Sequence, residues 1–105
     1  MTAAEKVNYR EGIVRITSIL ADLAHDSKEL EKAALLAYTE LELSEKIGWL
    51  MFIGCDCQLI AQALARQGKL AEGLPYAHRA VELFTKYPQL GGLEDAQAAL
   101  SECEG

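Results

Sequence analysis

The sequence predicts a single all-α domain of about five helices, most of them arranged as tandem helix-turn-helix repeats. Apolar residues recur three and four positions apart along nearly the whole chain, and no segment shows the strict alternation of a half-buried strand. The chain also resembles itself after about forty residues, an interval typical of stacked helical hairpins. With 105 residues, 50% of them hydrophobic, it has the size and composition of one folded domain.

The first expected helix pair covers residues 6–46, with one helix over about 6–24 and another over about 28–46. In both helices the apolar residues fall on one face, because they are spaced close to the helical period. The break between the helices is marked by three polar residues, His25, Asp26 and Ser27. The side chain of either Asp26 or Ser27 would cap the second helix by accepting a hydrogen bond from a free backbone N–H.

The second expected pair covers residues 48–86, with helices over about 48–67 and 70–86. Gly68 separates them, and glycine commonly ends a helix because it has no Cβ to oppose a left-handed backbone. The first of these helices opens with consecutive apolar residues from Trp49 to Ile53. This pattern predicts a central helix whose start is covered by neighbours on both sides. A capping helix over 93–103 follows.

The repeat is clearest when the helix expected over 28–46 is superimposed on the helix expected over 70–86 with a shift of about forty residues. The matched pairs include Leu30 with Leu70, Ala37 with Ala77, Leu43 with Leu83 and Lys46 with Lys86. The segment 48–84 resembles the tetratricopeptide repeat family in its longer form. The resemblance implies that small and aliphatic residues fill the packed positions, among them Ile60, Ala61, Leu64, Leu70, Gly73, Ala77 and Ala80.

Three residues depart from the family pattern. Cys57 stands where an aromatic residue is usual, and Leu64 replaces a usual tyrosine. In the first copy, Glu40 occupies a position where a small residue is expected. The second copy is therefore the better match of the two.

The resemblance implies a scaffold or adaptor that binds a protein or peptide segment, without catalytic activity and without a cofactor or metal. In this family the first helices of successive pairs line a concave groove. The positions of this chain that map to the groove are Val14, Thr17, Ala21, His25, Cys55, Gln58, Gln62 and Arg66. They are mostly neutral, which favours an apolar or amphipathic helix as the ligand. It is equally open that they are ordinary half-exposed surface positions.

Two rival functions use other residues. A histidine phosphotransfer or other small signalling four-helix bundle would act through His78, although the expected downstream basic residue and glycine are replaced by residues 79–82. A carrier of a metal or small ligand would use Cys55, Cys57 and Cys103. Residues two apart on a helix do not face each other, so the first two of these cysteines are poorly placed to share one metal ion.

The composition argues against several partners and locations. A net charge of -6 disfavours nucleic acid, which is bound by clustered Lys and Arg. The longest apolar run, 47–55, is far shorter than the roughly 20 residues of a membrane span. Charged residues within 1–12 disfavour a secretory signal, and an odd number of cysteines without a disulfide framework favours the reducing cytoplasm.

Two further expectations concern the surface. About two and a half repeats are near the lower limit for a stable stack, and the first helix carries more apolar residues than one face needs, so we expect a homodimer formed through an end helix. The helix over 28–46 ends with three glutamates, Glu40, Glu42 and Glu45. We expect a solvated acidic face there, with a basic partner as the alternative.

Overall fold

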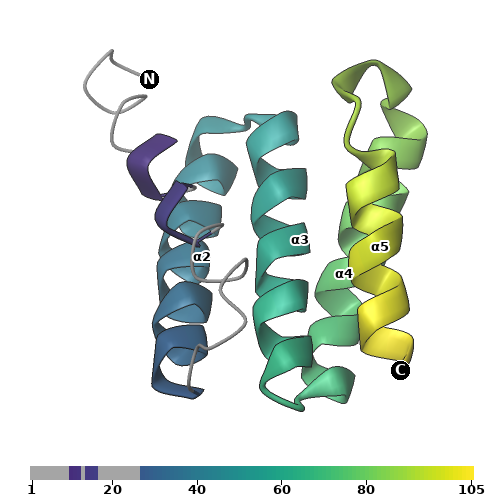
Figure 1. The fold of residues 1–105 in the computed structure, drawn as a ribbon. Coiled ribbons are helices and arrows are strands. Elements are labelled where there is room, and N and C mark those ends of the chain that lie inside the picture. The colour runs from purple at the N-terminus through teal and green to yellow at the C-terminus, as the bar shows by residue number, and fades with distance from the viewer. Residues whose placement is uncertain (1–9, 13, 17–26) are drawn as a thin grey trace.

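The computed structural model describes residues 10–12, 14–16 and 27–105, and the regular elements in them are all helical. Residues 10–12 and 14–16 are helical and precede the labelled helices (Figure 1). The labelled elements are α2 (Ser27–Ile47), α3 (Leu50–Arg66), α4 (Leu70–Lys86), the short 3-10 helix η1 (Pro88–Leu90) and α5 (Leu93–Glu104). The all-α prediction is confirmed, and the expected bounds of α4 coincide with those of the structure.

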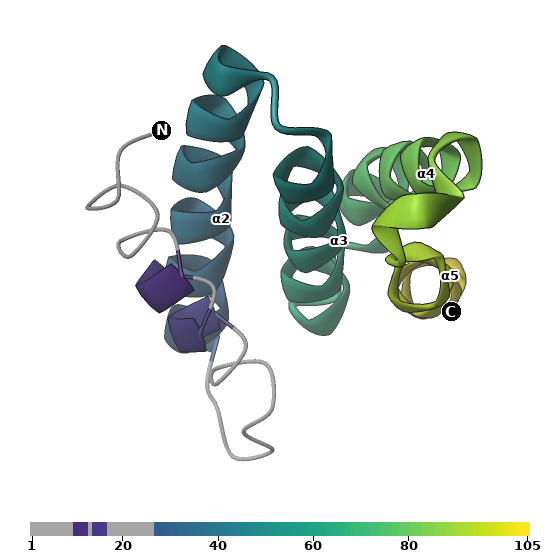
Figure 2. The ribbon, with the colours of Figure 1, turned by 90° about the horizontal axis from the view of Figure 1, so that it is seen from above.

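The helices are stacked side by side in the order of the chain. Helix α2 packs against α3, α3 packs against α4, and α5 lies against both α4 and α3. Seen from above, α3 lies between α2 on one side and α4 with α5 on the other (Figure 2). Helix α3 is therefore the central element of the described part, as its apolar sequence predicts.

Glycines allow the sharp reversals that end α2 and α3. Gly48 and Gly68 have backbone φ angles of 78° and 82°, in the left-handed region that residues with a Cβ rarely adopt. After α3, the amide of Lys69 donates a hydrogen bond of 2.9 Å to the carbonyl of Leu64, which satisfies a group at the helix end. The short turns set neighbouring helices side by side.

The core between α3 and α4 is built around Phe84, whose side chain is 1% exposed. A Cβ added at Gly54 of α3, or at Gly92 before α5, would overlap the ring of Phe84. Both glycines therefore allow the backbone to approach the ring closely. Ile60 and Ala80, each 0% exposed, belong to the same apolar cluster.

The start of α3 differs from the prediction. Leu50 and Met51 are 39% and 45% exposed, although the apolar run predicts coverage on both sides. Trp49 and Phe52 are half-buried and contact each other, with ring centroids 4.7 Å apart. The run begins immediately after the chain reverses at Gly48, so the first turn of α3 stands at the edge of the stack. In the described part of the chain, no helix has the length and apolar character required to cross a membrane.

Candidate functional site

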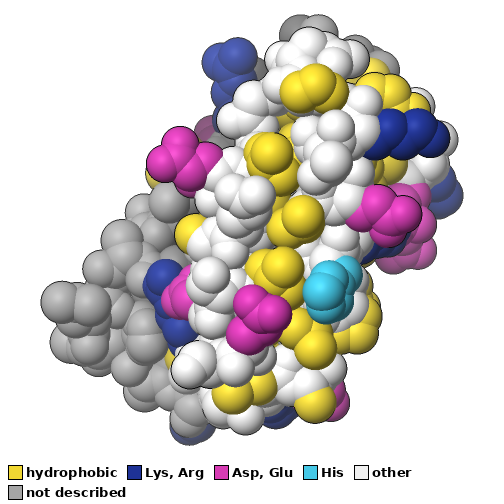
Figure 3. Space-filling model, turned by 90° about the vertical axis from the view of Figure 1, so that its right-hand side faces the viewer, with side chains coloured by type: hydrophobic (Ala, Val, Ile, Leu, Met, Phe, Trp, Pro, Cys, Tyr) yellow, Lys and Arg dark blue, Asp and Glu magenta, His cyan; other side chains and the backbone are white. Residues whose placement is uncertain are grey.

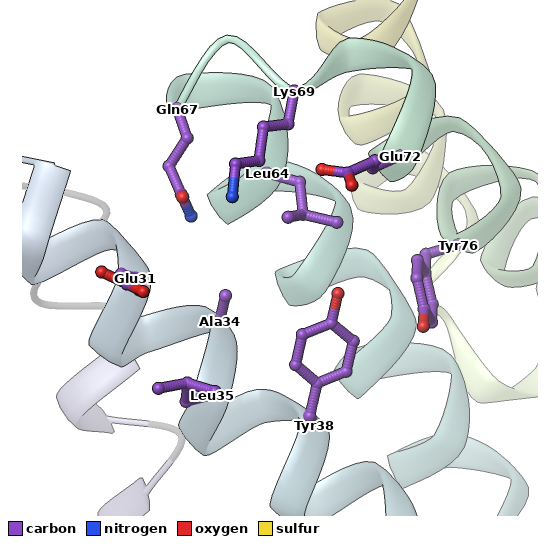
Figure 4. A pocket seen from close by; sticks show the side chains of 9 residues that line it. All are labelled: Glu31, Ala34, Leu35, Tyr38, Leu64, Gln67, Lys69, Glu72 and Tyr76. Carbon is purple, nitrogen blue, oxygen red and sulfur yellow. The ribbon is translucent and has the colours of Figure 1, made fainter.

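The candidate site is a groove of about 410 Å³ between α2, the end of α3 and the start of α4 (Figure 4). It collects side chains from three consecutive helices and from the turn between α3 and α4. The lining residues are Glu31, Ala34, Leu35 and Tyr38 of α2, Leu64 of α3, Gln67 and Lys69 of the turn after α3, and Glu72 and Tyr76 of α4. Apolar and aromatic groups are thus combined with a few polar groups, as is usual for binding sites.

Two tyrosines connect α2 and α4 across this groove. The rings of Tyr38 and Tyr76 meet edge to face, with centroids 5.7 Å apart and an interplanar angle of 68°. Burial, followed by the proximity of Tyr76 and Glu72, raises the pKa of Tyr38 to about 12. A hydrogen bond between the Tyr38 and Tyr76 side chains contributes to this rise, and the Tyr38 hydroxyl keeps its proton at neutral pH.

Apart from the two tyrosines, no side-chain hydrogen bond or ion pair joins the described polar groups of the groove to one another. Gln67 and Lys69 point into the groove from the turn between α3 and α4 (Figure 4). The Nε2 atom of Gln67 is buried and has no hydrogen-bond partner. Lys69, Glu31 and Glu72 all belong to the described residues, and no ion pair joins the lysine to either glutamate. An unpaired buried donor costs about 1–3 kcal/mol, so a ligand carbonyl that reaches Gln67 would relieve this cost.

Four of the predicted groove residues come together elsewhere, along one strip of α3. Cys55, Gln58 and Gln62 are half-buried, and Arg66 is exposed. Gln58 Nε2 donates a hydrogen bond of 3.3 Å to Gln62 Oε1. At the end of the strip, Arg66 Nε lies 3.1 Å from Glu102 Oε1 of α5. The polar groups of this strip are thus largely satisfied within the protein.

The other predicted groove residues lie near the N-terminus. Val14 is 64% exposed in the helical residues 14–16. The remaining three, Thr17, Ala21 and His25, lie outside the described residues.

The α2–α3–α4 groove was not among the sequence predictions. Leu64 follows Cys55 by about two and a half helical turns, so the groove lies on the side of α3 opposite the predicted strip. A usable signal was present, because Tyr38 and Tyr76 both stand within the second helix of an expected pair. Their contact depends on how α2 and α4 are placed relative to each other, which the spacing within each helix does not reveal.

A second polar cluster is buried between α2 and α3. Glu40 is 6% exposed, and Ser44 and Asp56 are each 0% exposed. Ser44 Oγ donates to Asp56 Oδ2 at 2.8 Å and lies 2.9 Å from the carbonyl oxygen of Glu40. Burial and the neighbouring Asp56 raise the pKa of Glu40 to about 7.

The prediction of a solvated acidic face is therefore wrong for Glu40, although Glu42 and Glu45 are exposed as expected. Glu40 follows Ala33 and Ala37 along the buried stripe of α2. The packing of this face of α2 therefore buries the carboxyl group of Glu40.

The residues of the rival functions are placed separately. His78 is exposed on α4. The thiols of Cys55, Cys57 and Cys103 are free, and burial raises the pKa of Cys55 and of Cys57 to about 11. These two thiols are therefore protonated at neutral pH. Among the described residues, no group of three or more His, Cys, Asp or Glu side chains is arranged to hold a metal ion.

Neither a protein-family model, nor a curated protein, nor a solved structure matches this chain. The groove and the helical stack are therefore the features of this chain that bear on its function.

Proposed function

We propose that this chain is a non-catalytic interaction module of the tetratricopeptide-repeat kind that holds a segment of a partner protein in the α2–α3–α4 groove. The observation that carries the proposal is the buried, unpaired Nε2 atom of Gln67 beside an apolar surface. A bound segment would bury apolar side chains against Tyr38 and Leu64. One of its carbonyl groups would accept a hydrogen bond from Gln67.

The order of the helix contacts supports a repeat stack. In a stack of hairpins each element packs mainly on its neighbours in the sequence, whereas in a four-helix bundle all four helices surround one core. Here α3 separates α2 from α5 (Figure 2). The same arrangement favours a scaffold over a histidine phosphotransfer bundle.

The proposed interaction takes place in the cytoplasm and involves a protein rather than nucleic acid. Free thiols at Cys55, Cys57 and Cys103 are in line with a reducing compartment. The net charge of -6 opposes binding to a phosphate backbone.

A site-specific crosslink tests the proposed groove. A photoreactive phenylalanine analogue is introduced at Leu35, which lines the groove and is 59% exposed, and the protein is irradiated in its native cells. The control carries the same analogue at Glu82, which is exposed on α4 and does not line the groove. We expect a discrete protein adduct from position 35 alone, and we expect Gln67→Ala to reduce its yield.

Two results would contradict this assignment. Equal adducts from positions 35 and 82 would indicate collisions rather than a binding site. A discrete adduct obtained with the analogue at Gln58, but not at Leu35, would indicate that the partner binds the strip on α3.

We also propose that the chain forms a homodimer through an end of the stack. Hydrophobic side chains follow a broken stripe on the face of α4 and α5 seen in Figure 3. At this end Leu70 is 38% exposed, and Leu74 and Leu100 are partly buried. Light scattering at micromolar concentration is expected to give twice the 11.5 kDa of one chain, and the mass of a single chain would refute the dimer.

The second candidate function, phosphotransfer through His78, is favoured only by the exposure of this residue on α4. Incubation with a phosphohistidine donor distinguishes the two functions. An acid-labile label that is lost in His78→Gln would favour the phosphotransfer function over the scaffold function.

A further inference from the structure

We propose that Glu40 is a proton-dependent latch that holds the N-terminal segment, described at residues 10–12 and 14–16, against α2 while its carboxyl group is protonated and loosens this segment when it ionises. Glu40 and its neighbours Ser44 and Asp56 do not line the α2–α3–α4 groove. It rests on the burial of Glu40, on its missing hydrogen-bond partner and on the close approach of Gly12.

The first observation is the contact between the N-terminal segment and α2. Gly12 is buried, and a Cβ added there would overlap the Oε1 atom of Glu40. Ile16, one turn further along, is 0% exposed and belongs to the main apolar cluster. The segment therefore covers the carboxyl group of Glu40 with backbone and is itself held by an apolar side chain.

The second observation is the proton count of the cluster. A serine hydroxyl has one proton to donate, and the hydroxyl of Ser44 already lies within hydrogen-bond distance of Asp56 Oδ2 and of the Glu40 carbonyl oxygen. It cannot also satisfy the carboxyl group of Glu40, whose Oε2 atom is buried without a partner. An ionised carboxylate in this position would be both desolvated and unpaired, which is strongly unfavourable.

The third observation is the set of charged groups around Glu40. From α3 it faces Asp56, whose charge adds to the cost of ionising Glu40. The charged residues described in the segment 10–16, Arg10, Glu11 and Arg15, are exposed. No ion pair to Glu40 occurs among the described residues, since the two that form join Arg66 to Glu102 and Arg79 to Glu45.

These observations give the latch its direction. When Glu40 loses its proton to the solvent, a second negative charge forms beside Asp56 and must be hydrated. Oε2 of Glu40 is buried and the backbone at Gly12 lies against Oε1, so hydration of the ionised carboxylate is expected to displace Gly12. Displacement of this segment uncovers Ile16 and the surface of α2 beneath it. The raised pKa of Glu40, about 7, places the transition near neutrality.

Side-chain carbon NMR of the full chain tests the titration directly. The carboxyl carbon of Glu40 is followed between pH 4 and 9, and we expect a midpoint near 7. A midpoint near the ordinary value of 4.5 would overturn the proposal. In Asp56→Asn the repulsion is removed, so the midpoint is expected to move to lower pH. An unchanged midpoint would also count against the latch.

Hydrogen exchange of the backbone amides tests the release. After correction for the intrinsic pH dependence of exchange, protection within 10–12 and 14–16 is expected to fall by up to about tenfold per pH unit between pH 4.5 and 7, where opening releases the proton, and to level off above 7. Protection within α4 is expected to stay higher than in this segment at every pH, because the segment opens locally. The isosteric Glu40→Gln should abolish the pH dependence, whereas Glu42→Gln, which changes an exposed residue of the same helix, should keep it.

Two outcomes of the exchange experiment would refute the latch. One is the same loss of protection in Glu40→Gln as in the wild type. The other is equal protection in this segment and in all helices, which would indicate that the segment exchanges only by global unfolding. If Glu40→Gln does not fold, the carbon titrations of the wild type and of Asp56→Asn still decide the matter.

Discussion

In the second of the two expected helix pairs, α3 approaches α4 where Gly54 faces the ring of Phe84, and in the first expected pair residues 10–12 and 14–16 approach α2 where Gly12 faces the carboxyl group of Glu40. Both contacts use a glycine to bring the backbone close to a side chain of the neighbouring helix. The group that fills the space is an apolar ring in one pair and a titratable acid in the other. The geometry is shared, while the chemistry of the contact differs.

The difference follows from the repeat frame. With the shift of about forty residues, Glu40 and Ser44 correspond to Ala80 and Phe84. Ala80 and Phe84 are 0% and 1% exposed, and Glu40 and Ser44 are 6% and 0% exposed, so equivalent positions are buried in both pairs. Apolar burial is insensitive to pH, whereas a buried carboxyl group makes stability conditional on its proton. We therefore expect the second pair to provide the stable part of the fold.

The largest effect is expected for Phe84→Ala. Removal of a buried ring between α3 and α4 leaves a cavity, and such substitutions cost about 3–5 kcal/mol. Urea denaturation followed by circular dichroism measures the loss. Thr85→Ala is the matched control, because Thr85 is exposed and its hydroxyl donates only to the carbonyl of Val81, four residues earlier. A similar loss in both variants would remove the distinction between the two helix pairs.

The next largest effect is the pH dependence that Glu40 confers. Its pKa is raised from the ordinary 4.5 to about 7 in the folded protein, so the folded state binds this proton more tightly than the unfolded state. The resulting stabilisation is complete below pH 4.5 and is lost as the pH rises through 7. Its full size is on the order of 3 kcal/mol. Urea denaturation at several pH values measures this contribution.

Glu40→Gln provides the control for this titration. The amide remains neutral, so the variant is expected to lose the Glu40 contribution to the pH dependence and to exceed the wild type in stability above pH 8. An equal change in stability between pH 5 and 8 in the wild type and in Glu40→Gln would contradict the assignment of this effect to Glu40.

The sequence predicted helices such as α4 well because the signals are local. The apolar period of α4 lies between Gly68 and Pro88, so both its ends are marked in the sequence itself. The exposed start of α3 was predicted wrongly, because an apolar run shows which residues prefer burial but not whether a neighbouring helix reaches them. Leu50 and Met51 remain exposed because no neighbouring helix among the described residues covers them.

The polar sites were harder to predict for the same physical reason. Glu40 is unusual only because of its contacts with Asp56 and Gly12, which come from other segments of the chain. The α2–α3–α4 groove likewise combines residues from three helices whose relative placement is set by packing. Periodicity within one helix contains no information about these distances.

A smaller effect is expected at the groove that joins the two pairs. Gln67→Met keeps a similar volume and removes the unpaired buried donor, so it is expected to stabilise the free protein by about 1 kcal/mol. The same change should weaken the crosslink from position 35. Gln62→Met is the control, because its amide oxygen accepts a hydrogen bond from Gln58 and its removal should not stabilise the fold. Stabilisation by both changes would indicate a general effect of hydrophobicity.

The smallest effect is expected for the ion pair that also connects the two helix pairs, between Arg79 of α4 and Glu45 of α2. The atoms Nη1 and Oε1 lie 2.9 Å apart, but both side chains are 46% exposed. Solvent screening limits such pairs to about 0.2–1 kcal/mol. A double-mutant cycle with Arg79→Met and Glu45→Gln is expected to give a coupling in this range that decreases with added salt. A coupling well above it, independent of salt, would mean that the two pairs are held together by charge more than by the apolar contacts of α3.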